Sequence, residues 1–218
     1  STGDVLKTKN KYDSFGLHAY GAYAPVDRVN LIGTLSWMHN SSDITQSINA
    51  AGFNKADADV KTNLFSLGAR AEANLPVGKA NVIPHAGLRY VWAKSGSYDT
   101  KVDGKKVWGN TPDATNTFQL PIGVAVRGDI MTVSGWNVRP QADLTFIPQF
   151  GDTEQKTKLS NFNGVSDKLS GEFAGKFGTS VNLGVQADKG PTTFGVRYGF
   201  TAGTKGKADH AFKFEYRY

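Results

Sequence analysis

The chain has 218 residues, a formal net charge of +6 and no cysteine. No run of about 18 apolar residues occurs, which excludes a transmembrane helix. The basic residues are spread along the chain rather than clustered among aromatic residues, which argues against nucleic-acid binding. A membrane protein built from strands is compatible with this composition, because such a strand needs only about 9–11 residues with every second one apolar.

Apolar residues occupy every second position in nine segments, the pattern of β-strands with one apolar and one polar face. The polar faces carry too much charge for the core of a soluble β-sandwich. In chain order, we expect strands at residues 15–23, 29–37, 64–75, 82–93, 118–127, 136–146, 177–187, 194–201 and 212–218. In the last segment aromatic and charged residues alternate strictly: Phe212, Lys213, Phe214, Glu215, Tyr216, Arg217 and Tyr218.

The connections between these strands alternate between short and long. The short ones are Pro25–Arg28, Pro76–Ala80, Gly128–Ser134 and Asp188–Pro191. The long ones, rich in Gly, Asn, Asp, Ser, Thr and Lys, are Asn40–Thr62, Lys94–Asn116 and Gly151–Leu169, with Ala202–His210 of intermediate length. Short periplasmic turns and long extracellular loops are typical of outer-membrane barrels. The sequence therefore predicts an all-β, antiparallel transmembrane β-barrel of the bacterial outer membrane.

Six of the seven arginines fall in the polar phase of their strands. They are Arg70, Arg89, Arg127, Arg139, Arg197 and Arg217. Lys213 shares this phase, and Glu72, Asp143 and Glu215 are available there as partners. The rigid guanidinium fork holds several acceptors at once. These arginines either only stiffen the wall of the barrel or also contact a chain threaded through its lumen.

Large aromatic residues lie near the ends of the apolar faces. They are Tyr23, Trp37, Trp92, Trp136, Tyr198 and Tyr218. This position suits the girdles that barrels carry at the two membrane interfaces. The alternative is ordinary packing of aromatic residues on a sheet.

The C-terminal segment Phe212–Tyr218 resembles the terminal signal by which the barrel-assembly machinery recognises bacterial outer-membrane proteins. That resemblance implies that Phe212, Phe214, Tyr216 and Tyr218 form an assembly signal. One departure is Lys213, which stands where such signals often have Gly.

Residues 12–218 resemble the translocator domain of type V autotransporters. The segments that carry the resemblance are YDSFGLHAYGAYA, RVNLIGTLSW, NLFSLGARAEANLPVG, VIPHAGLRYVWA, NVRPQADLTFIPQFGD, GEFAGKFGTSVNLGVQ, TTFGVRYGF and FKFEYRY. The family implies a twelve-stranded barrel with an N-terminal helix or linker in the pore. Since single-chain bacterial barrels have even strand numbers, we expect strands to be missing before residue 12.

Residues 1–11 show no alternation and are interpreted as an extracellular loop or N-terminal remnant. If the chain closed by itself, these residues would have to pair with the C-terminal strand. Residues 12–218 form the predicted barrel domain.

We expect the chain to export and display an N-terminal passenger, with outer-membrane lipid, lipopolysaccharide, the barrel-assembly machinery and its own passenger as partners. The alternatives are a stand-alone porin or adhesin with functional loops, and a barrel enzyme. No nucleophile elbow, HExxH motif or phosphate loop is present, and no His pair has metal-ligand spacing. His39 beside Asn40–Asp43 is interpreted as a loop residue among turn formers, so no enzyme and no cofactor are expected. The glycines of GVRYGF are interpreted as strand glycines that ease close packing.

Overall fold

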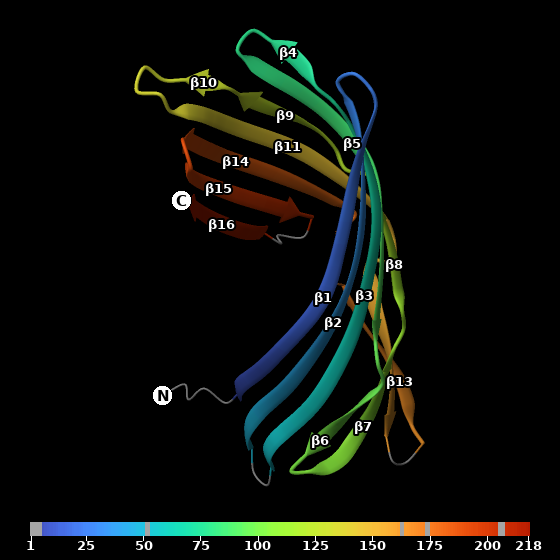
Figure 1. The fold of residues 1–218 in the computed structure, drawn as a ribbon. Helices are drawn as coiled ribbons and strands as arrows, with labels where there is room; N and C mark the ends of the chain where they lie inside the picture. The colour runs from blue at the N-terminus through green and yellow to red at the C-terminus, as the bar shows by residue number, and fades with distance from the viewer. Residues whose placement is uncertain (1–5, 51–52, 162–163, 173–174, 205–207) are drawn as a thin grey trace.

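The computed structural model of the chain describes residues 6–50, 53–161, 164–172, 175–204 and 208–218. The regular structure in these ranges is a single antiparallel sheet of 16 strands, curved into a trough (Figure 1). No helix in the described ranges is long and apolar enough to cross a membrane.

The predicted strands all occur, each hydrogen-bonded to the next, and they form the wall of the trough. β8 and β9 together occupy one place between β5 and β11, with a break at Leu120 and Pro121. Proline lacks an N–H for the ladder, which explains the break. The wall strands are β1 (Leu6–Val26), β2 (Val29–Ala50), β3 (Phe53–Ala73), β5 (Ala80–Ser95), β8 (Thr115–Gln119), β9 (Ile122–Gly128), β11 (Asn137–Gly151), β14 (Phe177–Lys189), β15 (Thr192–Gly203) and β16 (Ala208–Arg217).

The three long connections are not loops, as their composition predicted, but paired hairpins. β2 and β3 stay in register far beyond the predicted strands, as the pairs Ser41↔Lys61 and Asp43↔Asp59 show. The other two connections form β6 (Tyr98–Val102) with β7 (Lys105–Pro112), and β12 (Glu154–Asn161) with β13 (Ser166–Glu172). These strands extend the sheet at its lower end in Figure 1. Main-chain pairing does not depend on apolar side chains, so a polar composition does not exclude it.

Residues 6–11 of the segment interpreted as an extracellular loop or N-terminal remnant form the start of a strand. β1 begins at Leu6, and Leu6–Lys11 pair with Ile48–Asp43 of β2; residues 1–5 lie outside the described ranges. Residues 6–11 do not pair with the described part of the C-terminal strand, and such a pairing would have contradicted the hypothesis of missing strands. In the described ranges β1 pairs with β2 and β16 with β15, so both are edges of an open sheet.

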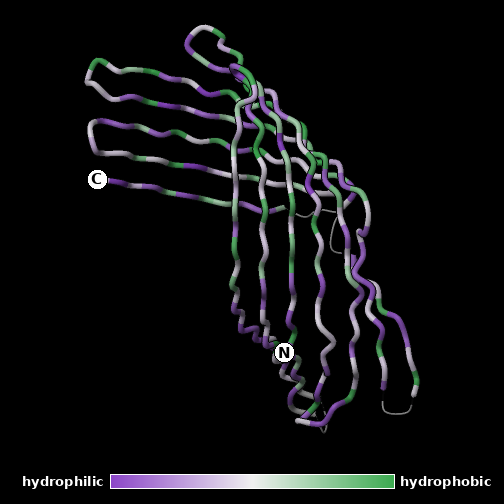
Figure 2. Tube along the Cα trace, turned by 45° about the vertical axis from the view of Figure 1, so that its right-hand side comes forward, coloured by the Kyte–Doolittle hydropathy of each residue, from purple (hydrophilic) through white to green (hydrophobic). Residues whose placement is uncertain are grey.

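The two faces of the wall differ in polarity and burial. Apolar residues at matching register positions, such as Val124, Leu144 and Val181, share the convex face. Leu144 is 39% exposed there and Phe214 is 69% exposed, whereas His85 on the polar face is 5% exposed. Green and purple positions alternate along the strands in Figure 2. Curvature crowds side chains on the concave face, so the polar residues are the enclosed ones.

Aromatic contacts form two rows on the convex face. Near the end with the long hairpins, ring centroids lie 6.1 Å apart in Phe15–Trp37, 5.0 Å in Tyr90–Phe118, 6.1 Å in Phe146–Phe177 and 5.7 Å in Tyr198–Phe212. Near the end with the short turns, they lie 6.0 Å apart in Trp136–Phe194 and 5.0 Å in Phe194–Tyr216. An apolar surface bounded by aromatic rows has the form of a membrane-facing barrel surface.

Candidate functional site

The concave face of the wall carries every charged residue that the sequence analysis assigned to a lumen. One register row runs Arg127↔Gln141↔Gly184↔Arg197↔Lys213 across five strand positions. A second row links Arg139, Gln186, Gly195 and Glu215. The remaining members, on the same face by alternation, are Arg70, Glu72, Arg89, Asp143 and Arg217.

A buried bridge crosses the centre of this face. His85 Nε2 lies 2.9 Å from Asp143 Oδ2, although their strands, β5 and β11, are separated by β9. Gly123 stands between them in β9, and a Cβ there would lie 2.6 Å from His85 Cε1. The missing side chain leaves room for the imidazole. Thr145 Oγ1 donates a 2.7 Å hydrogen bond to Asp143 Oδ1, so the carboxylate is held on both oxygens.

The arginines divide into two groups. Arg70 Nη2 lies 3.2 Å from Glu72 Oε2, and Arg217 Nη2 lies 2.6 Å from Glu215 Oε1. Arg89 Nε donates to Ser66 Oγ at 3.2 Å, and Arg139 pairs with Asp188. Arg127 and Arg197 have no side-chain hydrogen bond or ion pair within the described ranges. These two guanidinium groups are therefore available to bind another molecule.

Two of the three carboxylates expected to hold arginines do so, namely Glu72 and Glu215. Asp143 binds His85 and Thr145 instead. Sequence reasoning missed Asp188, which also accepts hydrogen bonds from Gln186 Nε2 at 3.0 Å and Thr193 Oγ1 at 2.9 Å. The signal for it was present: Asp188 continues the polar phase of β14 one residue beyond the predicted strand end.

Long polar side chains on the concave face stand opposite glycines. This complementarity relieves crowding, because a glycine leaves room for the side chain of its cross-strand partner. A Cβ on Gly184, for example, would lie 2.8 Å from Gln141 Nε2 and 3.1 Å from Arg197 Cγ. The pairs are Arg70↔Gly87, Arg89↔Gly68, His85↔Gly123, Arg197↔Gly184, Asn182↔Gly199 and Glu215↔Gly195.

A hollow of about 210 Å³ opens on the concave face beside the bridge. Its polar lining comes from Arg70, Arg127, Gln141, Asp143 and Asn182. The Nε of Arg70 is buried and has no hydrogen-bond partner in the described ranges. Two guanidinium groups and two amides suit an acceptor such as a carboxylate or a peptide carbonyl.

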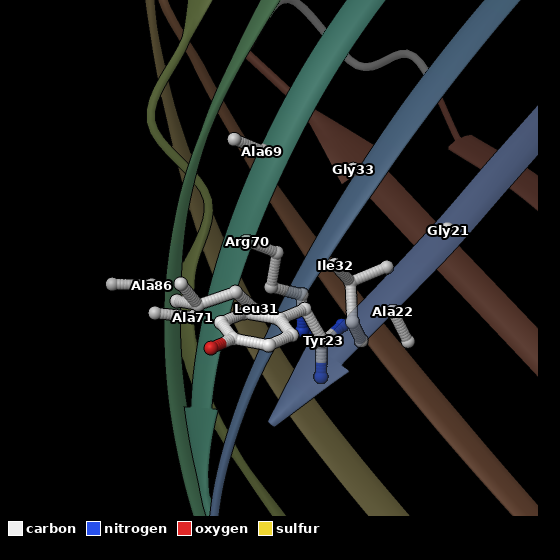
Figure 3. A pocket seen from close by; sticks show the side chains of 10 residues that line it. All are labelled: Gly21, Ala22, Tyr23, Leu31, Ile32, Gly33, Ala69, Arg70, Ala71 and Ala86. Atoms are coloured by element: carbon white, nitrogen blue, oxygen red, sulfur yellow. The ribbon is translucent and has the colours of Figure 1, made fainter. Parts of the chain in front are cut away.

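The convex face has a larger apolar hollow of about 660 Å³, shown in Figure 3. It exists because small residues, including Gly21, Gly33 and Ala69, adjoin one another across β1, β2 and β3. The Tyr23 ring and Leu31 lie beside it. It is an apolar surface whose one charged lining residue, Arg70, belongs to the concave face, and we assign no site there.

The segment after His39 does not assemble a catalytic group. His39 belongs to β2 rather than to a loop, since pairing with β3 continues through it. Its Nδ1 lies 2.9 Å from Asn63 Oδ1. Strand alternation sends Asn40 to the opposite face, where Tyr12 donates a hydrogen bond to it. Within the described ranges, no group of three or more acidic or histidine side chains could hold a metal ion.

The predicted assembly-signal residues lie on the convex face of an edge strand. β16 pairs with β15 from Thr193↔Arg217 to Ala202↔Ala208. Phe212 and Phe214 are strongly exposed, Tyr216 contacts Phe194, and Tyr218 follows the strand. An exposed aromatic face on a terminal strand is accessible to a partner.

Comparisons with known proteins identified two similar solved structures and one matching family. The crystal structure of the beta domain of the Bordetella autotransporter BrkA has a TM-score of 0.51 and 12% identity, over 97% of this chain and 91% of that one. The transport unit of the autotransporter AIDA-I from Escherichia coli has a TM-score of 0.33 and 10% identity, over 98% of this chain and 83% of that one. No curated protein matches the sequence. The autotransporter beta-domain family matches residues 1–199, and the chain belongs to that family.

Proposed function

We propose that the chain forms most of the wall of an outer-membrane translocator barrel, which exports an N-terminal passenger to the bacterial surface. The observation that carries this proposal is the division of the wall into an exposed apolar convex face and a charged concave face. The apolar face suits contact with lipid, and the charged face suits contact with water in a pore. The end with short turns is then periplasmic, and the long hairpins are extracellular.

The open edges of the sheet support a barrel with additional strands. Unpaired N–H and C=O groups in lipid cost several kcal/mol each, so β1 and β16 cannot both face hydrocarbon unpaired. We propose that preceding strands of the full-length protein join the two edges and complete the twelve strands typical of the family. The aromatic face of Phe212, Phe214, Tyr216 and Tyr218 then serves the barrel-assembly machinery during insertion.

We further propose that the concave face binds the passenger or its linker within the pore. Arg70, Glu72, Arg89, Arg139, Asp143, Glu215, Lys213 and Arg217 line the path, and most of their charges are used within the wall. Arg127 and Arg197 carry the binding itself, because they lack partners in the described ranges and share one register row. Acceptors on the linker replace the water around these two guanidinium groups.

The test is surface display of the native passenger by the full-length protein, measured by protease access on intact cells. We expect Arg127→Ala with Arg197→Ala to slow display while the barrel keeps its thermal stability. Arg139→Ala is the matched control, because it removes an arginine of the same face that is paired within the wall. We expect it to lower the thermal stability of the barrel, since Asp188 loses its charged partner. A passenger that stays in the periplasm although the wild-type barrel is inserted would refute the translocator role.

A stand-alone porin or adhesin is the second candidate, and one observation favours it. The β6–β7 and β12–β13 hairpins are ordered, paired elements that could present a binding surface outside the membrane. Removal of both hairpins separates the two functions. Loss of cell adhesion by a full-length protein that displays no passenger supports the stand-alone adhesin, whereas unchanged passenger display after the removal supports export.

A further inference from the structure

A second apolar hollow lies on the convex face, at the end with the short turns. Its volume is about 630 Å³. It is formed by β5, β9 and β11 together with two short strands, β4 (Leu75–Val77) and β10 (Ile130–Met131). The apolar residues that line it are Val77, Ala80, Val126, Ile130, Pro140 and Ala142.

Register places the apolar lining residues on the lipid-facing side of the wall. Val126 pairs with Ala142 in β11 and with Val82 in β5, all in the apolar phase. Ile130 pairs with Val138, which is in the same phase. The hollow therefore continues the apolar convex surface, and it exists because Ala80, Gly128 and Ala142 are small.

The apolar surface does not stop at the wall but extends onto the turns. Val77 is 60% exposed and Ile130 is 46% exposed. Water would surround these side chains if the turns projected into the periplasm. Exposed apolar residues that adjoin an apolar cavity mark an interaction surface.

One cation stands at the rim of the hollow. Lys79 lies in the turn between β4 and β5, and the amide of Asp129 donates to its carbonyl oxygen at 3.4 Å, which ties this turn to β10. Its ammonium has no ion pair in the described ranges. The neighbouring turn carries one acidic residue, Asp129. The hollow in Figure 3 differs in this respect, because its one cation, Arg70, belongs to the concave face.

We propose that this hollow binds one phospholipid of the periplasmic leaflet, with an acyl chain against Val126, Ile130 and Pro140 and the head-group phosphate against Lys79. This inference rests on the proposed function, because it requires the short turns to face the periplasm. Continuity with the lipid-facing surface and the unpaired ammonium at its rim favour a lipid over a protein partner. A basic side chain beside anionic lipid is attracted to its head group.

Neighbouring residues on opposite faces provide the first test. Since the chain contains no cysteine, Ile130→Cys and Met131→Cys each give one labelling site in the full-length protein. We expect a fluorophore at residue 130 to be quenched by brominated acyl chains in phosphatidylethanolamine and phosphatidylglycerol vesicles. The label at residue 131, on the concave face, should be quenched by aqueous iodide instead. The proposal would be overturned if iodide quenched the label at residue 130. It would also be overturned if that label were protected from iodide only after a periplasmic protein fraction was added.

Lipid retention provides the second test. Native mass spectrometry of the purified protein should show bound phospholipid in the wild type and its loss in Ala142→Leu, which fills the hollow. Lys79→Gln should reduce the preference for phosphatidylglycerol by about fivefold, the effect of one basic side chain at an anionic lipid surface. The controls Ala69→Leu, at the other hollow, and Lys158→Gln, on a long hairpin, should retain the lipid. Equal retention in all variants would overturn the site.

The two proposals fail in different ways. A wild-type protein that does not insert into the vesicles contradicts both the translocator and the lipid site. A protein that inserts and displays its passenger, but holds no more phospholipid than Ala142→Leu, contradicts the lipid site alone.

Discussion

Gly123→Ala should destabilise the barrel far more than an ordinary glycine-to-alanine change in a strand. The added Cβ would lie 2.6 Å from His85 Cε1 and 2.8 Å from Thr145 Oγ1, and closer still to the carbonyl oxygen of Leu144. That carbonyl belongs to the β9–β11 pairing and cannot retreat without loss of sheet hydrogen bonds. Overpacking of this kind typically costs about 1–3 kcal/mol. Displacement of the imidazole from Asp143 leaves buried polar groups unpaired, which adds about 1–3 kcal/mol.

The expected loss in the free energy of unfolding is therefore about 2–6 kcal/mol. It can be measured by urea unfolding of the detergent-refolded protein, followed by tryptophan fluorescence and by heat-modifiable migration. Gly33→Ala is the matched control, because a Cβ at residue 33 meets nothing within 4 Å. The double variant Gly123→Ala with His85→Ala should cost less than the sum of its single changes, since the removed imidazole frees the space. Equal stability of Gly123→Ala and Gly33→Ala would refute the argument.

Two further predictions concern the long hairpins and the terminal strand. Hydrogen bonds from the Lys55 ammonium, and then from the Thr45 hydroxyl, hold the pKa of Asp57 below its ordinary value. Because the folded pKa is lowered, this contact stabilises the β2–β3 hairpin at neutral pH and is lost as the pH falls through that pKa. Lys55→Met should raise the pKa of Asp57 in an NMR titration, and an unchanged titration would contradict the contact. Tyr216→Ser with Tyr218→Ser should slow membrane insertion, seen as delayed heat-modifiable migration, and insertion at the wild-type rate would count against the assembly signal.

The wall of the sheet could be predicted from the sequence because one period-2 signal repeats along it. Each strand has to bury an apolar face, and a shift of one residue would turn that face to the wrong side. The hairpins beyond the wall escaped prediction because they lack this constraint. In β3, for example, Asp57, Asp59 and Lys61 alternate with Ala56, Ala58 and Val60. The charged residues keep the period of two, but the small residues between them give only a weak apolar pattern.

The concave site could be predicted as a set of residues but not as a network. Alternation alone assigns Arg70, Glu72 and Asp143 to one face. The partner of Asp143 is 58 residues away in the sequence and two strand positions away in the sheet. That pairing depends on the register of β5 and β11 on the two sides of β9, and on the glycine at position 123, none of which a single-strand pattern contains.

The distribution of hydrogen bonds on this face links its stability to its proposed role. Ion pairs and the His85–Asp143 bridge satisfy most charged groups within the wall, which keeps the concave face rigid. If every guanidinium group were paired within the wall, none would be free for the proposed binding of the linker. If none were paired, the burial of unpaired charge would weaken the sheet. The wall resolves this conflict by position, because the row of Arg127 and Arg197 runs through Gln141 and a glycine, with no carboxylate at any of its steps.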